Sequence, residues 1–289
     1  MELYIRKNTE LRKKTKSDFE VNLYKLLSNS VFGKTMENLR KRVDVKLLRP
    51  SETESFRKLI AKPTYNRLLI FGDAGDLAAV HMNKSSLLLN RPVFVGTSIL
   101  DLSKHLMYVW YYNYLKMLYK SSAELLYTDT DSLVLEIQTE HVYADMRRNA
   151  GQYDTSNYPK DHPLFSTANK KVLGKLKDEG AGTPIAEFLG IRPKMYSILK
   201  SDGLEERKAK GVKKAVVKKH ISHAQYKEAL FESKRFRHGM DMLRSRGHQI
   251  FGEHVNKTSL SPLNTKRWIA ADGISTLACG HREAGAAGE

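Results

Sequence analysis

Residues 125–137 place a short polar turn between an apolar run and a segment that alternates in hydrophobicity. An apolar run at 125–127 precedes the turn, and leucine or isoleucine returns at every second position of 133–137. This pattern predicts a strand, a turn and a second strand. Asp129 and Asp131 stand two residues apart in the turn. Because alternate residues of an extended chain share a face, both carboxylates are expected to project to the same side.

Two carboxylates held close together repel each other unless a cation or a proton lies between them. A hard divalent ion that prefers oxygen ligands, Mg²⁺ or Mn²⁺, suits such a pair. The sequence therefore predicts that Asp129 and Asp131 hold a divalent ion. The alternative is an ordinary turn, because Asp and Thr both favour turns.

Two strings of residues support the first interpretation. Residues 127–132, Y-T-D-T-D-S, resemble motif C of family B DNA polymerases. Residues 25–33, K-L-L-S-N-S-V-F-G, resemble motif B of that family, K-x-x-x-N-S-x-Y-G, with Phe32 in the usual tyrosine place. The two strings follow each other in the family order. The resemblance extends over most of the chain, from about residue 2 to about residue 281, and is nearest to the protein-primed branch found in viruses and Maverick/Polinton-type elements.

The motif B string has a physical rationale on a helix. Lys25, Asn29 and Phe32 are spaced i, i+4, i+7 and share a face. An ammonium, an amide and an aromatic ring on one stripe can hold a triphosphate, a sugar and a base. The nucleotide-binding residues implied by the resemblance are Lys25, Asn29, Ser30, Phe32 and Gly33. The leucines at 23, 26 and 27 lie off the stripe and are expected to face the core. The alternative is an amphipathic helix with a solvated lysine, ended by Gly33.

A DNA-binding region is expected after the carboxylate hairpin. Lys194 and Tyr196 resemble the K-x-Y motif, which in the family steadies the primer terminus; on a strand they would share a face. Residues 208–213 resemble the basic loop that joins palm to thumb. The DNA-binding residues implied are Tyr127, Thr130, Lys194, Tyr196, Lys208, Lys210 and Lys213. A solvated basic face is the alternative for the lysines. The net charge of +17 favours a polyanionic partner.

The expected fold class is α+β. The resemblance implies a helical fingers fragment at 1–40, an insertion-like segment with short strands at 41–90, a palm of antiparallel sheet with helices at 91–204, and a mainly helical thumb with a tail at 205–289. A helix is expected to begin after Ser17, with Glu20 completing a capping box. Further helices are expected at 98–119, buried, and at 222–246. Strands are expected at 87–89, 172–179 and 188–196.

The activity implied by the resemblance is that of a DNA-directed DNA polymerase in DNA replication. Such an enzyme transfers a nucleotide from a deoxynucleoside triphosphate to a primer on a DNA template, using two Mg²⁺ or Mn²⁺ ions, and in the protein-primed branch a terminal protein serves as primer. The resemblance implies Asp129 and Asp131 as catalytic carboxylates, with Asp131 as the leading metal ligand. Motif A, D-x-x-S-L-Y-P, does not occur in the 289 residues, and the family order places it before residue 1. The chain therefore resembles the C-terminal part of a polymerase, and by itself it is expected to be inactive.

Two other functions remain open at this point. The first is a non-catalytic DNA-binding remnant of a mobile element. The second is a reverse transcriptase, although the paired adjacent aspartates usual in that class do not occur in the turn. The single cysteine, Cys279, excludes an internal disulfide framework and a cysteine-based zinc cluster. No signal peptide and no long apolar run are found, so an intracellular location without a membrane partner is expected, in the nucleus for a eukaryotic host.

Overall fold

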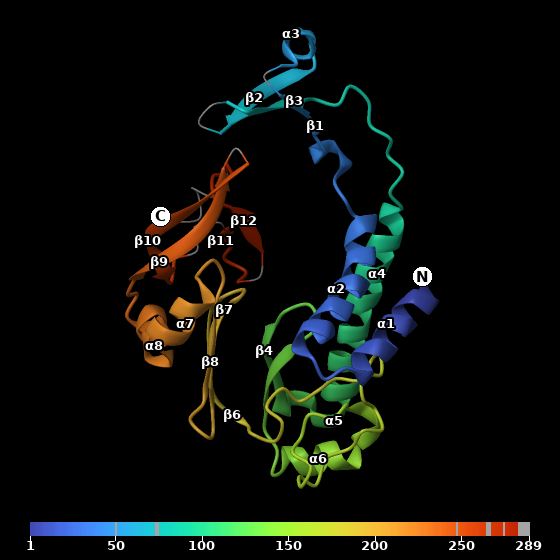
Figure 1. The fold of residues 1–289 in the computed structure, drawn as a ribbon. Coiled ribbons are helices and arrows are strands. Elements are labelled where there is room, and N and C mark those ends of the chain that lie inside the picture. The colour runs from blue at the N-terminus through green and yellow to red at the C-terminus, as the bar shows by residue number, and fades with distance from the viewer. Residues whose placement is uncertain (50, 73–74, 247, 264–266, 274, 283–289) are drawn as a thin grey trace. The chain divides into compact units, whose positions relative to one another are not determined.

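The structure is a computed structural model that describes residues 1–49, 51–72, 75–246, 248–263, 267–273 and 275–282 (Figure 1). Helices and small antiparallel sheets alternate along the chain, which confirms the expected α+β class. The chain divides into two compact units, residues 1–109 and residues 110–289.

Three helices form one part of the first unit. They are α1 (Glu2–Lys14), α2 (Asp18–Thr35) and α4 (Val93–Tyr108). In Figure 1, α2 lies beside α1 and beside α4, and residues of both pairs are in contact. Gly96 on α4 allows a close approach, since a Cβ there would lie 2.3 Å from Met36 Cγ and 2.7 Å from Thr35 Oγ1.

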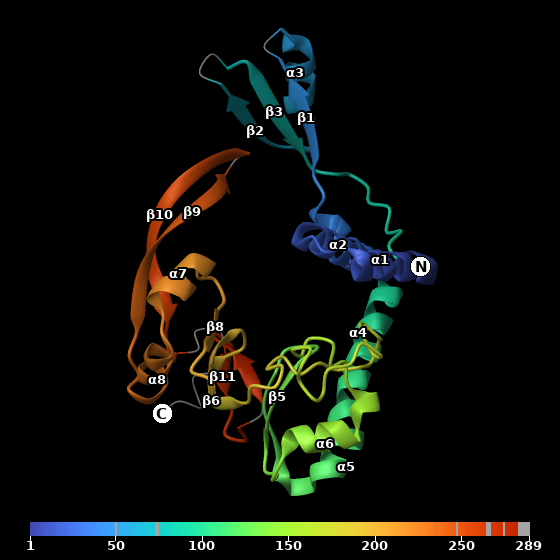
Figure 2. The ribbon, with the colours of Figure 1, turned by 60° about the horizontal axis from the view of Figure 1, so that its bottom comes forward.

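The other part of the first unit is a three-stranded sheet with one helix against it (Figure 2). Its strands are β1 (Asp44–Leu48), β2 (Tyr65–Phe71) and β3 (Leu77–Met82), in the order β1–β3–β2 and all antiparallel. The short 3-10 helix η1 (Leu39–Lys41) leads into β1, and α3 (Thr53–Ile60) follows it. Phe56 and Leu59 of α3 pack on the buried side chains of Leu48, Val80 and Met82, which make a small core.

The second unit begins with a wide helical turn, the π-helix η2 (Val109–Leu115), which continues into α5 (Lys116–Tyr119) and the 3-10 helix η3 (Lys120–Ser122). The hairpin strands β4 (Ala123–Thr128) and β5 (Leu133–Ile137) come next, followed by α6 (Val142–Arg148) and the 3-10 helix η4 (Ala150–Gln152). Trp110 is buried, and its indole N–H donates to Gly174 O at 2.9 Å. This contact ties η2 to the irregular segment after α6.

The remainder of the second unit is built on a second three-stranded antiparallel sheet. Its strands are β6 (Ile185–Arg192), β7 (Met195–Lys200) and β8 (Glu205–Ala209), in that order. The helices α7 (Lys214–His220) and α8 (His223–Phe231) follow, and their buried residues share a core with Leu189, Met195 and Ala209. Two hairpins complete the unit: the long β9 (Phe236–Arg246) with β10 (Gln249–Leu260), and β11 (Arg267–Ile269) with β12 (Thr276–Ala278).

The expected helix at 222–246, and with it the mainly helical thumb, is wrong. The helix α8 ends at Phe231, and Ser233 takes a left-handed φ of 55°, a conformation that a helix does not continue through. Residues 236–246 form the strand β9 instead, with inward and outward residues alternating over its first half. The alternation of Phe236, His238 and Met240 is the pattern of a strand that is covered on one face.

Several expected boundaries in the first unit also need correction. The helix expected from Ser98 begins at Val93, and residues 87–89 form no strand. Leu102 and Leu106 of α4 are exposed, so that part of the expected helix is not buried. Ser17 is the N-cap of α2, but its side chain makes no capping bond. The expected capping box is wrong in its other half too, because the Ser17 N–H donates to the Thr15 hydroxyl, which itself donates to the Glu20 carboxylate.

Two other expectations differ from the structure. Residues 172–179 contain a turn and one isolated bridge at Leu176 rather than a strand. Leu23 and Leu26 of α2 are exposed, while Leu27 is half-buried, so only the last of these three leucines packs inward as expected.

Candidate functional site

The carboxylate pair lies at the tip of the β4–β5 hairpin. The two strands pair antiparallel, with Thr128 opposite Leu133, which confirms the strand, turn and strand expected from the alternation. The turn is closed by the Asp129 N–H and the Thr128 hydroxyl, which donate to Ser132 O at 3.2 and 3.1 Å. Thr130 sits at the apex with φ of 61°, a left-handed conformation that is uncommon for a β-branched residue. The turn is therefore tight and strained between the two aspartates. The extended backbone from which the shared face of the two carboxylates was predicted is not present at Thr130, so that part of the expectation is wrong.

Asp129 and Asp131 have different surroundings. The Asp129 carboxylate is a third exposed and forms an ion pair with Lys194, with 3.1 Å between Oδ1 and Nζ. The Asp131 carboxylate is exposed and makes no ion pair with any residue that the structure describes. The ammonium of Lys194 reduces the repulsion between the two aspartates, because it compensates the charge of one of them.

Lys194 reaches the hairpin tip from the turn between β6 and β7. It has φ of 63° and lies between the strands, so the expectation that it lies on a strand beside Tyr196 is wrong. Pro193 cannot donate to the ladder, and the chain turns there. The backbone N–H of Lys194 donates to the Tyr127 hydroxyl at 3.0 Å. Lys194 thus contacts the hairpin twice, through its backbone at Tyr127 and through its side chain at Asp129.

Three aromatic rings pack where the hairpin meets the sheet. The ring centroid of Tyr127 lies 4.9 Å from that of Tyr196 and 5.8 Å from that of Phe188, and the last two rings are 5.9 Å apart. Burial raises the pKa of Tyr196, and the nearby Tyr127 and Asp129 raise it further. Ring pairs at these separations stabilise a contact beyond the area they bury. The cluster therefore holds the carboxylate hairpin against β6 and β7.

The basic residues expected to bind DNA divide into two groups. Lys208 on β8 lies directly across from Tyr196 on β7 and is exposed, and the backbone N–H of Lys210 donates to Lys194 O at 3.0 Å. These residues are therefore neighbours of the hairpin contact. Lys213 differs, because its ammonium donates to Asp241 O on β9 at 2.9 Å.

The motif B residues lie on α2. Lys25 and Asn29 are exposed and Phe32 is half-buried. Gly33 does not end the helix, which continues to Thr35, and a Cβ at Gly33 would meet no atom within 4 Å. Ser30 follows Asn29 and is turned away from the Lys25 stripe, and its hydroxyl donates to Leu27 O at 2.9 Å.

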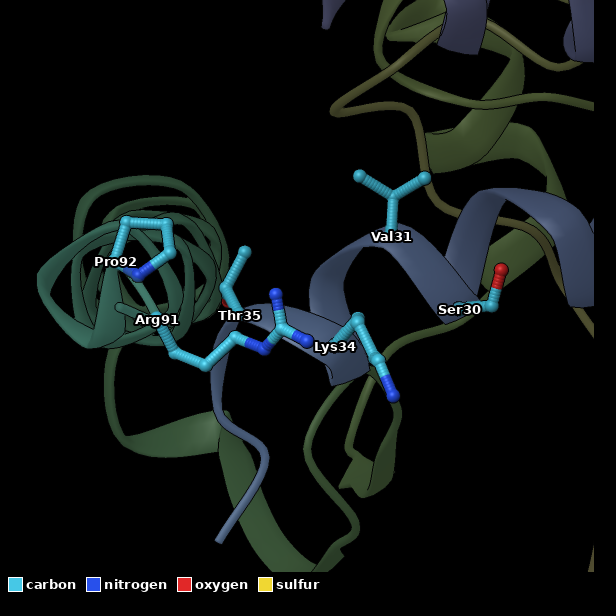
Figure 3. Close-up of a pocket in the computed structure, with 6 residues that line it drawn as sticks. All are labelled: Ser30, Val31, Lys34, Thr35, Arg91 and Pro92. Atoms are coloured by element: carbon cyan, nitrogen blue, oxygen red, sulfur yellow. The ribbon is translucent and has the colours of Figure 1, made fainter. Parts of the chain in front are cut away.

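A shallow hollow of about 480 Å³ opens on the other side of α2 (Figure 3). It is lined by Ser30, Val31, Lys34, Thr35, Arg91 and Pro92. The two cations there are already paired, since Glu37 lies 2.9 Å from Lys34 and 3.3 Å from Arg91. Hydrogen bonds from Arg42, and then from Lys34, lower the pKa of Glu37 to about 2. Sequence reasoning missed this cluster because Arg91 is far from Glu37 along the chain.

The donor set at the hairpin tip fits part of the coordination sphere of a divalent ion. Carboxylate oxygens are the ligands that Mg²⁺ and Mn²⁺ prefer, and the tip offers two carboxylates. Within the ranges that the structure describes, no three His, Cys, Asp or Glu side chains gather in a group suited to a metal ion. Asp131, with no competing cation, is the better placed of the two aspartates to hold one.

Comparison with known proteins adds no relative. No protein-family model matches the chain, and no curated protein and no solved structure matches it. A function must therefore be argued from the site itself. None of the helices in the described ranges combines the length and the apolar character needed to cross a bilayer.

Proposed function

We propose that the chain is part of a DNA-directed DNA polymerase of family B and contributes the carboxylate hairpin, a nucleotide-binding helix and a primer-binding sheet. One observation supports this above the others. Lys194 and Asp129 come from two motifs that are far apart in the sequence, and they form an ion pair at the hairpin tip. Separate short motifs that meet at one point are better evidence of a shared task than either motif alone.

In the proposed reaction, the primer 3′-hydroxyl attacks the α-phosphate of a deoxynucleoside triphosphate, a new phosphorus–oxygen bond forms, and the bond to pyrophosphate breaks. Asp131 holds the divalent ion and Asp129 supports it, directly or through its charge. When bound, the ion supplies positive charge that stabilises the attacking and leaving oxygens of an in-line displacement.

The other residues bind and orient the substrates. Lys194 compensates the negative charge of Asp129. Together with Lys208 and Lys210, it also binds phosphates of the primer-template. The Tyr127–Tyr196 contact keeps the hairpin and the primer-binding sheet at a constant distance. On α2, Lys25 neutralises charge on the triphosphate, and Asn29 and Phe32 shape the place for the sugar and the base.

Nucleotide-dependent DNA binding tests this function without requiring turnover. A fluorescent primer-template with one templating base is titrated with the chain in Mg²⁺, with each of the four deoxynucleoside triphosphates in turn. The nucleotide complementary to the template should tighten binding, the other three should not, and the effect should be lost in Lys25→Ala. Salt-sensitive binding that no nucleotide changes would contradict the polymerase and favour a non-catalytic DNA-binding protein.

A further inference from the structure

A buried chain of hydrogen bonds lies on the β6–β7–β8 sheet, away from the aromatic cluster. Ser197 of β7 is fully buried, and its hydroxyl lies 2.8 Å from Nδ1 of His223. His223 is also buried, and its Nε2 lies 3.2 Å from Oε2 of Glu187 on β6. Lys227 on the next turn of α8 pairs with the other oxygen of Glu187 at 2.8 Å.

These residues alternate along the strands with the residues of the candidate site. Ser197 follows Tyr196 on β7, and Glu187 precedes Phe188 on β6. Neighbouring residues of a strand point to opposite faces of the sheet. The rings that pack on Tyr127 and the groups that bind His223 are therefore on opposite faces of the same two strands.

The first turn of α8 is bound to the third strand as well. The backbone N–H of His223 donates to Oε2 of Glu205 on β8 at 3.0 Å. Glu205 also accepts from Arg207, whose guanidinium donates to Ile221 O at 2.6 Å. Through His223 and its neighbours, the start of α8 makes polar contacts with β6, β7 and β8.

Serine, histidine and glutamate are also the residue types of a hydrolytic triad, but this geometry does not support one. The Ser197 hydroxyl has no exposed surface, so no substrate reaches it. The imidazole also faces the serine with Nδ1, whereas Nε2 faces the nucleophile in the serine-protease triad. The chain of bonds is therefore suited to holding parts of the protein together.

The pairing requirements place a proton on Nε2 of the imidazole. An ionised carboxylate only accepts hydrogen bonds, so Nε2 carries the proton that is shared with Glu187. Nδ1 is paired with the Ser197 hydroxyl, and every polar group of the chain of bonds has a partner. Because a buried hydroxyl or imidazole without a partner is costly, this network favours one spacing of β6, β7 and α8.

We propose that His223 is a positioning residue for the primer-binding face: it holds β6 and β7 in the arrangement in which Phe188 and Tyr196 pack against Tyr127. The consequence for DNA rests on the proposed function, whereas the consequence for the rings does not. Loss of the His223 contacts loosens the packing of Tyr196 on Tyr127, and the turn that carries Lys194 loses its place at Asp129.

The test compares two histidines that make the same kind of contact. His223→Asn keeps an acceptor near the position of Nδ1 and loses the contact with Glu187. His238→Asn is the matched control, because Nδ1 of His238 lies 2.7 Å from the hydroxyl of the buried Ser259, on the β9–β10 hairpin. Tyrosine ring resonances are recorded by NMR and assigned to Tyr127 and Tyr196 with tyrosine-to-phenylalanine variants. Both rings should shift in His223→Asn and stay unchanged in His238→Asn.

DNA affinity provides the second measurement. His223→Asn should weaken binding of a primer-template about tenfold, which corresponds to about 1.4 kcal/mol, and should have no further effect when Tyr196 is already alanine. Unchanged rings and unchanged affinity in a variant that still unfolds cooperatively would overturn the proposal. If His223→Asn does not fold, Ser197→Ala, which removes one hydroxyl, takes its place. If the unaltered protein does not bind primed DNA, the proposed function fails, and the ring resonances still decide the role of His223.

Discussion

Asp129 and Asp131 carry the same group but have unequal tasks in the proposed site. The charge of Asp129 is compensated by Lys194, while Asp131 has no ion-pair partner among the described residues. A cation approaching the hairpin tip therefore meets its least compensated negative charge at Asp131. Charge matters more than shape at such a position, so replacing the carboxylate by the isosteric amide is the informative change.

We predict that Asp131→Asn, in a polymerase completed with the motif A segment that the proposed function requires, abolishes primer extension. The loss should be at least about 10²–10³-fold, the size seen when one transition-state contact is removed, and duplex affinity should stay nearly constant. Asp129→Asn should cost less, because Lys194 already offsets its charge. Gel-based assays give the rate of primer extension, and fluorescence anisotropy gives the affinity for duplex DNA. Extension by Asp131→Asn at the unaltered rate would disprove the assignment of Asp131 as the leading metal ligand.

The lysines beside the hairpin should differ in their contribution to DNA binding. Each phosphate contact that is lost lowers the slope of log affinity against log salt by about one. We predict this decrease for Lys208→Ala and for Lys210→Ala, whose side chains are exposed and form no ion pair among the described residues. Lys213→Ala is the control and should change the slope less, because its ammonium already binds Asp241 O. If all three variants keep the salt slope of the unaltered protein, these lysines are only solvated surface.

Two glycines of the helical part of the first unit should respond to alanine in opposite ways. At Gly96 a Cβ would lie 2.3 Å from Met36 Cγ and 2.7 Å from Oγ1 of the buried Thr35, so Gly96→Ala should destabilise the protein by about 1–3 kcal/mol, the range for overpacking. At Gly33 the Cβ would meet nothing within 4 Å, so Gly33→Ala should stabilise the helix by about 0.5–1 kcal/mol. Urea unfolding measures both, and a stabilising Gly96→Ala would contradict the close approach of α4 to Met36.

Elements whose pattern is local could be predicted from the sequence. The β4–β5 hairpin follows from an apolar run before a polar turn and alternation after it, and α1 and α2 follow from runs of helix formers. Residues 222–246 could not be assigned in this way, because basic residues at irregular intervals suit a helix surface and a strand equally. The left-handed Ser233 that separates α8 from β9 has no sequence signal of its own, since serine rarely adopts that conformation.

The sequence predicts residues for the candidate site but not their contacts. The carboxylates and the K-x-Y residues are predicted from short strings, yet the pair of Lys194 with Asp129 depends on how a turn of one sheet meets the tip of a separate hairpin. The Ser197–His223–Glu187 chain was missed for the same reason. Its three residues come from two strands and a helix, and each is unremarkable in its local sequence.

For the molecule as a whole, DNA binding and nucleotidyl transfer have different requirements and can be predicted separately. The net charge of +17 and the exposed lysines near the aromatic cluster should make the 289-residue chain bind primer-template duplex with a strong dependence on salt. Binding needs only these cations. Nucleotidyl transfer also needs compensation of the charge that develops on the reacting phosphate, which is commonly the largest catalytic contribution. In the proposed function, bound divalent ions would supply this compensation. The hairpin tip offers two carboxylates to hold them, one of them already paired with Lys194.

We therefore expect residues 1–289 alone to bind primed DNA and not to extend it. The measurement is primer extension by the purified chain with Mg²⁺ or Mn²⁺, beside a salt titration of DNA binding by the same preparation. Asp131→Asn serves as the control, because any extension that persists in this variant comes from a contaminating polymerase. Template-directed extension by the unaltered chain that disappears in Asp131→Asn would contradict the prediction. It would mean that another carboxylate of the chain completes the metal site beside Asp131.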